Sequence, residues 1–230
     1  MKHSLPVLAA AVVLAGCGEF PKQLHVDDRS RPVVSARGLW RLGQGPGGPG
    51  LELEHLQAHA RGEQTLGSLD VATLEGRSLT GPGLLHHDVH AYDTSLLYNH
   101  RLFPGRLLEL EWFAGVSWHT TDWSTTSDTP GDPRLSRRAT WSGPAGGVLG
   151  RVNLAPGLSI EGRYSGAARV WGDTYGSRYD AELAFAFRPP GPLVLRAGLA
   201  EHRSWIDSDG LNSELSVRAR GPFLNLGLEF

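Results

Sequence analysis

Residues 221–230 alternate between apolar and polar or small side chains with a period of two. One face of an extended segment carries Leu224, Leu226, Leu228 and Phe230, and the opposite face carries Phe223, Asn225, Gly227 and Glu229. Successive side chains of a β-strand point to opposite sides, so this alternation predicts a strand with one apolar face and one more polar face. A strand of this kind requires neighbours, because an isolated strand or hairpin is at best marginally stable in water.

The same alternation recurs from His86 to the last residue and predicts seven strands. They cover residues 86–102, 106–119, 137–154, 158–170, 179–188, 193–202 and 215–230. Several of these segments exceed the ~5–6 residues usual in soluble sheets and reach the ~9–11 residues that cross a bilayer. In the last one the apolar set moves from odd to even positions at Gly221 and Pro222, which predicts a β-bulge at that point.

The connections between these strands alternate in character. Those at 103–105, 155–157 and 189–191 are tight and contain Pro and Gly, whereas those at 120–136, 173–177 and 207–212 are polar and mostly longer. Membrane barrels of the outer-membrane type have short turns on the periplasmic side and longer loops outside. The alternation therefore predicts that every tight turn lies at the same end of the protein as Phe230.

The strand pattern and the alternation that leads to Phe230 together resemble bacterial outer-membrane β-barrel proteins. The resemblance implies an all-β fold, a transmembrane antiparallel up-and-down β-barrel, with outer-membrane lipid around it. It also implies that the barrel-assembly machinery reads the last strand and Phe230. Adding one strand at 51–61 gives eight strands, and adding three at 33–43, 51–61 and 69–79 gives ten. Ten is favoured because it leaves less of the chain unexplained, and both counts start and end at one end of the barrel.

Residues 1–16 have a basic start, a short apolar run and small residues, which is typical of a signal peptide. The run Leu14-Ala15-Gly16-Cys17 resembles a bacterial lipobox and implies cleavage before Cys17 and acylation of its thiol. Residues 17–32 are polar without periodicity and predict a flexible tether to a barrel at 33–230. The predicted location is the outer membrane of a Gram-negative bacterium. Cys17 is the only cysteine, which excludes an internal disulfide or a thiolate metal site.

Charges of both signs occupy the face of these strands that is opposite to the apolar one. An Arg turned towards lipid costs about 2–4 kcal/mol at mid-bilayer, so the charged faces are expected to point inward. A small barrel has an interior that side chains fill, and this predicts a lumen packed with ion pairs. The candidates are Glu109, Glu111, Glu161, Arg163, Arg169, Asp180, Glu182, Arg196 and Arg218.

Histidines and carboxylates gather where the predicted strands meet the longer loops, and the candidates are His86, His90, His119 and Asp122. Such groups can bind a metal or act as a base with its orienting partner. On one strand, however, His86 and His90 lie about 13 Å apart by strand rise, too far to bind one ion directly. Polar side chains near lipid headgroups are the favoured interpretation, and neither a metal nor another cofactor is predicted.

The chain has 22 Lys and Arg against 24 Asp and Glu, which does not indicate a nucleic-acid partner. The sequence favours a structural or accessory outer-membrane protein with a charged, filled lumen. Three alternatives stay open at this point: a rim hydrolase acting on lipopolysaccharide or peptide, a lipid-tethered soluble periplasmic β-domain, and a narrow passive channel.

Overall fold

The computed structural model of the chain describes residues 20–21, 24–29, 31–42, 48–74, 77–172, 175–207 and 214–230. The predicted signal peptide at 1–16 and the predicted acylation of Cys17 lie outside these residues. The described residues contain no helix that could span a bilayer.

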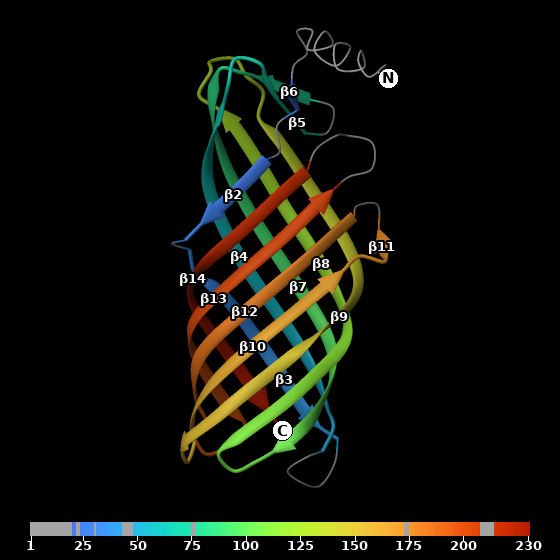
Figure 1. Cartoon of the computed structure of the whole chain (residues 1–230), viewed down its shortest axis with the longest axis vertical. Helices are drawn as coiled ribbons and strands as arrows, with labels where there is room; N and C mark the ends of the chain where they lie inside the picture. The colour runs from blue at the N-terminus through green and yellow to red at the C-terminus, as the bar shows by residue number, and fades with distance from the viewer. Residues whose placement is uncertain are drawn as a thin grey trace, which may run out of the picture.

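In the described part of the chain, nine strands close into a β-barrel, which confirms the all-β barrel prediction (Figure 1). They are β3 (Val33–Arg41), β4 (Gly50–Leu66), β7 (Gly83–Pro104), β8 (Leu108–Ser127), β9 (Leu135–Ala155), β10 (Leu158–Ala168), β12 (Tyr175–Phe187), β13 (Leu193–Asp207) and β14 (Glu214–Glu229). Neighbouring strands are antiparallel, apart from the parallel pair β14 and β3. A short strand β11 (Trp171–Gly172) pairs with β9.

The barrel has one strand fewer than the ten favoured from the sequence and one more than the alternative of eight. The difference lies at 69–79, which forms β5 (Asp70–Leu74) and β6 (Arg77–Thr80) rather than a barrel strand. With β1 (Phe20–Pro21) they make a separate three-stranded sheet. Because the number of strands is odd, the first and the last strand run in the same direction. β3 therefore begins at one end of the barrel, and β14 finishes at the other end. The expectation that the barrel starts and ends at one end is therefore wrong.

Part of the predicted tether is a strand. β2 (Leu24–Asp28) pairs in parallel with β14, from Leu24 opposite Leu215 to Asp28 opposite Ala219. Its side chains alternate between buried and exposed, so it lies against the barrel with one face covered. The prediction of a flexible tether is wrong for these residues.

The two ends of the barrel differ. At one end, which we call the turn end, short connections join β7 to β8, β9 to β10 and β12 to β13, and β14 also ends there (Figure 1). Gly157 and Gly191 have φ angles of 76° and 110° in two of these turns, a conformation that glycine adopts without strain. At the opposite end, the loop end, β4, β7, β8 and β9 extend beyond the other strands, and the sheet of β1, β5 and β6 lies there.

The two faces of a long strand such as β7 exchange polarity along its length, while its pairing with β8 stays in one register from Leu85 to Arg101. In β7, the side chains of odd-numbered residues point inward: Leu85, Val89 and Ala91 near the loop end, then Asp93, Ser95 and Asn99 near the turn end. The outward side chains change in the opposite sense, from His86, Asp88 and His90 to Leu96 and Tyr98. The loop-end half thus has an apolar core and a polar surface, and the turn-end half has a polar interior and an apolar surface.

This exchange also corrects the predicted bulge in the last strand. The pairing of β13 with β14 runs without a shift from Leu193 opposite Leu228 to Asp207 opposite Glu214. Val217 and Phe223 both point inward, and Arg218 and Leu224 both point outward. The apolar set changes position because the surroundings of the strand change, while the backbone alternation continues through Gly221 and Pro222.

Candidate functional site

The outer surface of the turn-end half carries exposed apolar side chains on all nine barrel strands, and we call this surface the apolar belt. One representative from each strand is Val34, Leu53, Leu96, Leu110, Val148, Tyr164, Leu183, Leu199 and Leu226. Leu183 is 60% exposed and Leu199 is 64% exposed, although they are opposite each other on neighbouring strands. Soluble monomers rarely expose a contiguous apolar patch of more than a few hundred Å², so a belt on all nine strands is unusual for a surface in contact with water.

In the lumen inside the belt, near the turn end, the carboxylate of Glu161 contacts three arginines. Glu161 accepts hydrogen bonds from Arg151 and Arg196, each at 2.6 Å, and from Arg188. Arg196 also donates to Glu229 at 2.8 Å. The side chains of Arg151, Glu161 and Arg196 are each at most 6% exposed. Buried charges require partners of this kind, because leaving one unpaired in a dry interior is costly.

The next layer towards the loop end repeats the arrangement with strands from the first third of the barrel. Arg37 lies 2.5 Å from Glu54 and 3.2 Å from Glu182, and Arg163 lies 2.8 Å from Glu52 and 2.9 Å from Glu54. The guanidinium of Arg163 also lies 3.9 Å from the centre of the Phe113 ring. Acid and base therefore alternate across the lumen, and the pairs tie β3 and β4 to strands on other sides of the barrel.

A third layer contains histidines. Arg178 bridges Asp93 at 2.9 Å and Asp180 at 2.6 Å, and His202 Nδ1 lies 2.6 Å from Asp180 Oδ1. His119 Nδ1 lies 3.7 Å from Asp93. Both histidines are only 1% exposed. A histidine beside a carboxylate could serve as a base, but these two are closed off from solvent and stabilise the interior.

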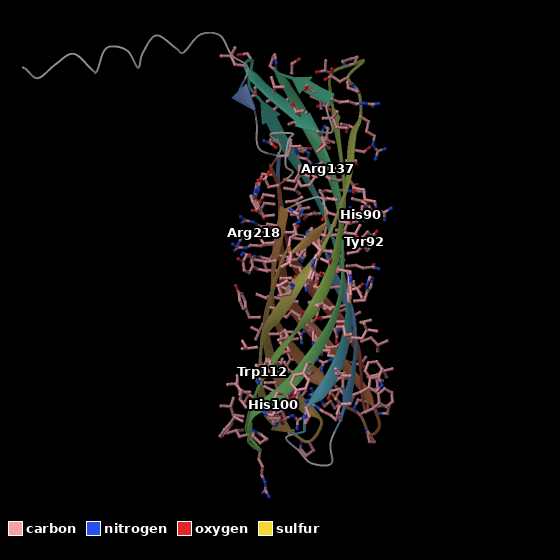
Figure 2. The ribbon with its side chains drawn as sticks, turned by 90° about the vertical axis from the view of Figure 1, so that its right-hand side faces the viewer. His90, Tyr92, His100, Trp112, Arg137 and Arg218 are labelled. Atoms are coloured by element: carbon pink, nitrogen blue, oxygen red, sulfur yellow. The ribbon has the colours of Figure 1, made fainter. Side chains whose placement is uncertain are left out.

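Most of the predicted lumen residues contact an opposite charge in this network. Glu111 contacts Arg41 and Arg101, and Glu109 contacts Arg151. Arg169 is half-buried just beyond the end of β10. Arg218 is the exception, because it lies on the outer surface, where it contacts Glu201 at 3.0 Å (Figure 2).

Charged residues of the lumen that were not singled out from the sequence include Arg37, Glu52, Glu54 and Arg178. In β4, Glu52 and Glu54 point inward near the turn end, whereas Ala58 and Ala60 occupy the inward face further along. The exchange of polarity within this strand obscures its alternation. A search for alternation in shorter windows would have found the two glutamates.

The predicted rim residues do not come together as one site. His119 is in the lumen, whereas His86 and Asp122 lie on the outer surface of the loop-end half. His90 lies on the same outer surface (Figure 2). His86 contacts Glu63 at 3.3 Å and Asp128 at 2.7 Å. Asp122 is opposite His90 in the sheet and contacts Arg138 at 3.2 Å.

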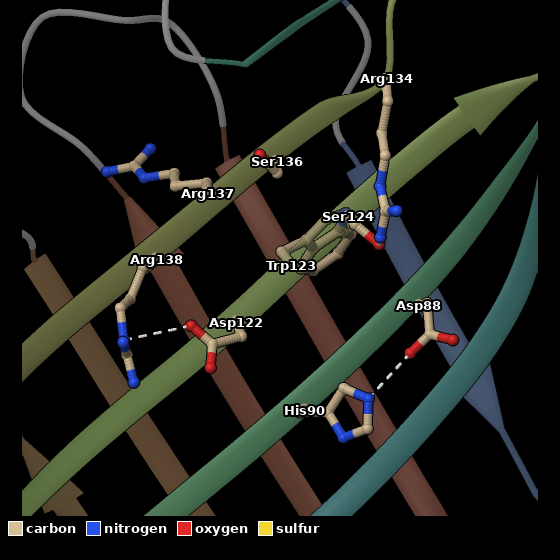
Figure 3. Close-up of a pocket in the computed structure, with 9 residues that line it drawn as sticks. All are labelled: Asp88, His90, Asp122, Trp123, Ser124, Arg134, Ser136, Arg137 and Arg138. Atoms are coloured by element: carbon tan, nitrogen blue, oxygen red, sulfur yellow. Dashed lines mark hydrogen bonds and ion pairs between the residues drawn. The ribbon is translucent and has the colours of Figure 1, made fainter.

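His90 belongs to a different group that no single strand reveals. His59 of β4 is directly opposite His90 of β7, and both Nε2 atoms approach Asp88 Oδ1, at 3.0 and 3.1 Å. Beside this group, a depression of about 570 Å³ is lined by Asp88, His90, Asp122, Ser124, Arg134 and Arg138, among others (Figure 3). His59 could not be singled out from the sequence, because only the register between β4 and β7 places it beside His90.

His87 is the buried histidine of the loop-end half, and its environment makes stability depend on pH. Burial, together with the nearby charges of His86 and His25, lowers the pKa of His87 to about 4. Its Nδ1 lies 2.9 Å from Thr125 Oγ1, and its ring packs against the edge of Trp123. The neutral form is therefore the one that fits.

We expect the protein to lose stability as the pH falls from 6.5 towards 4, because the unfolded chain then binds a proton that folded His87 does not. From pH 7.5 to pH 4.5 the loss from this residue is about 2–3 kcal/mol. Urea unfolding at the two pH values measures it, and a His87→Gln variant should lose correspondingly less. An equal loss in that variant would show that other groups cause the pH dependence.

No protein-family model, curated protein or solved structure matches this chain. The features that bear on its function are therefore those of the chain itself: the apolar belt, the charged lumen and the polar surface of the loop-end half.

Proposed function

We propose that this chain is an integral outer-membrane β-barrel protein with a structural or accessory role. Its turn-end half would span the bilayer, and its loop-end half would project into water. The observation that carries the proposal is the exchange of polarity between the two faces of single strands, as in β7 and β14. Near the turn end apolar side chains point outward and charges inward, as in a membrane barrel, and near the loop end the order is that of a soluble protein.

The dimensions and side chains of the apolar belt suit a bilayer. On β12 it extends from Tyr179 to Phe187, close to the ~9–11 residues of a membrane-crossing strand. Aromatic side chains gather near both of its borders, as in the girdles of membrane barrels. At the border near the turn end, the rings of Trp40 and Phe230 stack with their centres 6.3 Å apart. Trp118 and Tyr179 lie towards the border near the loop end.

The lumen favours a structural or accessory role over transport. Arg37, Glu54, Glu161, Arg163 and Arg196 are each at most 5% exposed, and each contacts an opposite charge. Above them the loop-end half is filled by an apolar cluster that includes Trp123 and Leu215. Side chains that fill the described part of the lumen in this way oppose the passage of ions, so we expect no ion conductance in planar bilayers.

In this proposal the turn end faces the periplasm, and the strand that ends at Phe230 is the segment that the barrel-assembly machinery recognises. Outer-membrane lipid would surround the apolar belt. Cleavage of residues 1–16 and acylation of Cys17 remain predictions from the sequence.

The decisive experiment separates the barrel from the predicted lipid. We expect a Cys17→Ala variant to remain in the outer-membrane fraction and to migrate anomalously on a gel until it is boiled, as folded membrane barrels do. Release of the variant as a soluble species without such a shift would contradict the proposal. That result would instead support a soluble periplasmic β-domain held by its lipid.

A further inference from the structure

We propose that His59, Asp88 and His90 form a binding site for a divalent transition-metal cation of the zinc class, on the outer surface of the loop-end half. The three residues offer one ligand atom each, and these atoms all lie within 4.8 Å of one another. Two imidazoles and a carboxylate make a ligand set that zinc commonly takes, with a fourth position left for water. The site is independent of the lumen and of the apolar belt.

The pairing of β4 with β7 creates this site. His59 and His90 are direct partners in the register, and their rings stack at 4.2 Å between centres. Asp88 is two residues before His90 on β7 and therefore points to the same face. Directly opposite residues on one face have their Cβ atoms about 4.5–5.5 Å apart, which lets two histidines reach one ion.

The distances within the group already approach those of a metal site. Asp88 Oδ1 lies 3.0 Å from His59 Nε2 and 3.1 Å from His90 Nε2. Ligands about 2.0–2.1 Å from a tetrahedral zinc ion lie roughly 3.3 Å from one another. Movement of the side chains would therefore bring them into position, and the cation would replace the hydrogen that now links His59 Nε2 to Asp88 Oδ1.

The other oxygen of Asp88 is already held in place. Arg61 Nε donates a hydrogen bond to Asp88 Oδ2 at 2.8 Å, which leaves Oδ1 directed towards the histidines. Figure 3 shows the contact between Asp88 and His90. Groups that orient a ligating carboxylate in this way are typical of protein metal sites. The side chain of His90 is 46% exposed, so a cation can approach and the ring can rotate out of the stack to present its nitrogen.

The neighbouring histidines do not offer an equivalent arrangement. His86 directs its two ring nitrogens to different carboxylates, Nδ1 to Glu63 and Nε2 to Asp128, so these contacts do not converge on one point. His55 lies on the same strand and face as His59, but its Nδ1 contacts Thr94 and its Nε2 contacts Gln57. His55 and His86 are therefore matched control positions, because each is a histidine on the outer surface without a convergent set of ligands.

Calorimetric titration of the full chain in detergent with zinc chloride, after treatment with a chelator, tests the proposal. We expect one zinc ion per chain for the unmodified protein. The variants His59→Ala, His90→Ala and Asp88→Asn should each lower the affinity at least about tenfold, and His55→Ala and His86→Ala should leave it within about twofold. The shift on boiling verifies that every variant is folded.

Two results would overturn the proposal. One is the absence of stoichiometric zinc binding by the folded, unmodified chain. The other is a loss of affinity in His55→Ala or His86→Ala as large as that in His59→Ala, which would show that zinc binds the surface histidines without a defined site.

Discussion

Glu161→Gln is expected to destabilise the folded barrel by about 3–5 kcal/mol, because it removes the carboxylate from a buried ionic cluster and leaves its partners in place. Glu161 contacts Arg151, Arg188 and Arg196, and it is 3% exposed. The glutamine keeps the shape of the side chain and can still accept hydrogen bonds. The expected loss therefore measures the uncompensated charge of the arginines, without a change in packing volume.

The chain supplies its own control for this substitution. Glu201 on the outer surface also contacts three arginines, Arg203, Arg218 and Arg220, but two of them are about half exposed. Ion pairs at a water-exposed surface contribute about 0–1 kcal/mol, so Glu201→Gln should have a small effect. The folded fraction on a gel, measured against urea in lipid vesicles, compares the two variants. Equal losses would contradict a dry, charged lumen.

Leu183→Arg is expected to cost about 2–4 kcal/mol of stability in a bilayer, because this side chain lies on the outer face of β12 within the apolar belt. Leu183 is 60% exposed, between Tyr179 and Phe187 along the strand. If the belt faced water, an exposed leucine could become arginine with an effect within about ±0.5 kcal/mol. The substitution therefore reports directly on what surrounds the turn-end half.

The matched control is Thr126→Arg, on the exposed outer face of β8 in the loop-end half. That position should face water, so its effect should be within about ±0.5 kcal/mol. Refolding both variants from urea into lipid vesicles gives their folded fractions. If Leu183→Arg folds and inserts as well as Thr126→Arg, the apolar belt is not in contact with lipid.

The part of the fold that could be predicted from the sequence is the part that depends on local pattern. Alternation located all seven barrel strands from His86 onward, and Pro and Gly marked the tight turns between them. The inward direction of Glu161 and Arg196 also followed from the sequence. Near the turn end each strand has one apolar face and one polar face, and both residues lie on the polar face. Near neighbours along one strand carry all of this information.

The strand count could not be predicted in this way. Residues 69–79 have too weak a pattern to show that they fold back as β5 and β6 above the barrel, and closure by nine strands depends on which edges meet. The odd number in turn decides that β3 and β14 run in parallel, and hence that the barrel begins at the loop end.

Local sequence pattern was enough to locate the seven strands from His86 onward, the tight turns between them and the presence of two unlike faces. Which face of a strand is exposed at a given height of the barrel depends on the tertiary structure. Arg218 and Glu161 both alternate with apolar neighbours along their strands, yet Arg218 lies on the outer surface and Glu161 lies in the lumen. The tertiary structure also decided that His59 faces His90, because strand register brings together residues far apart in the chain. Alternation specifies that two faces differ, but which one is buried depends on the surroundings at that height of the barrel.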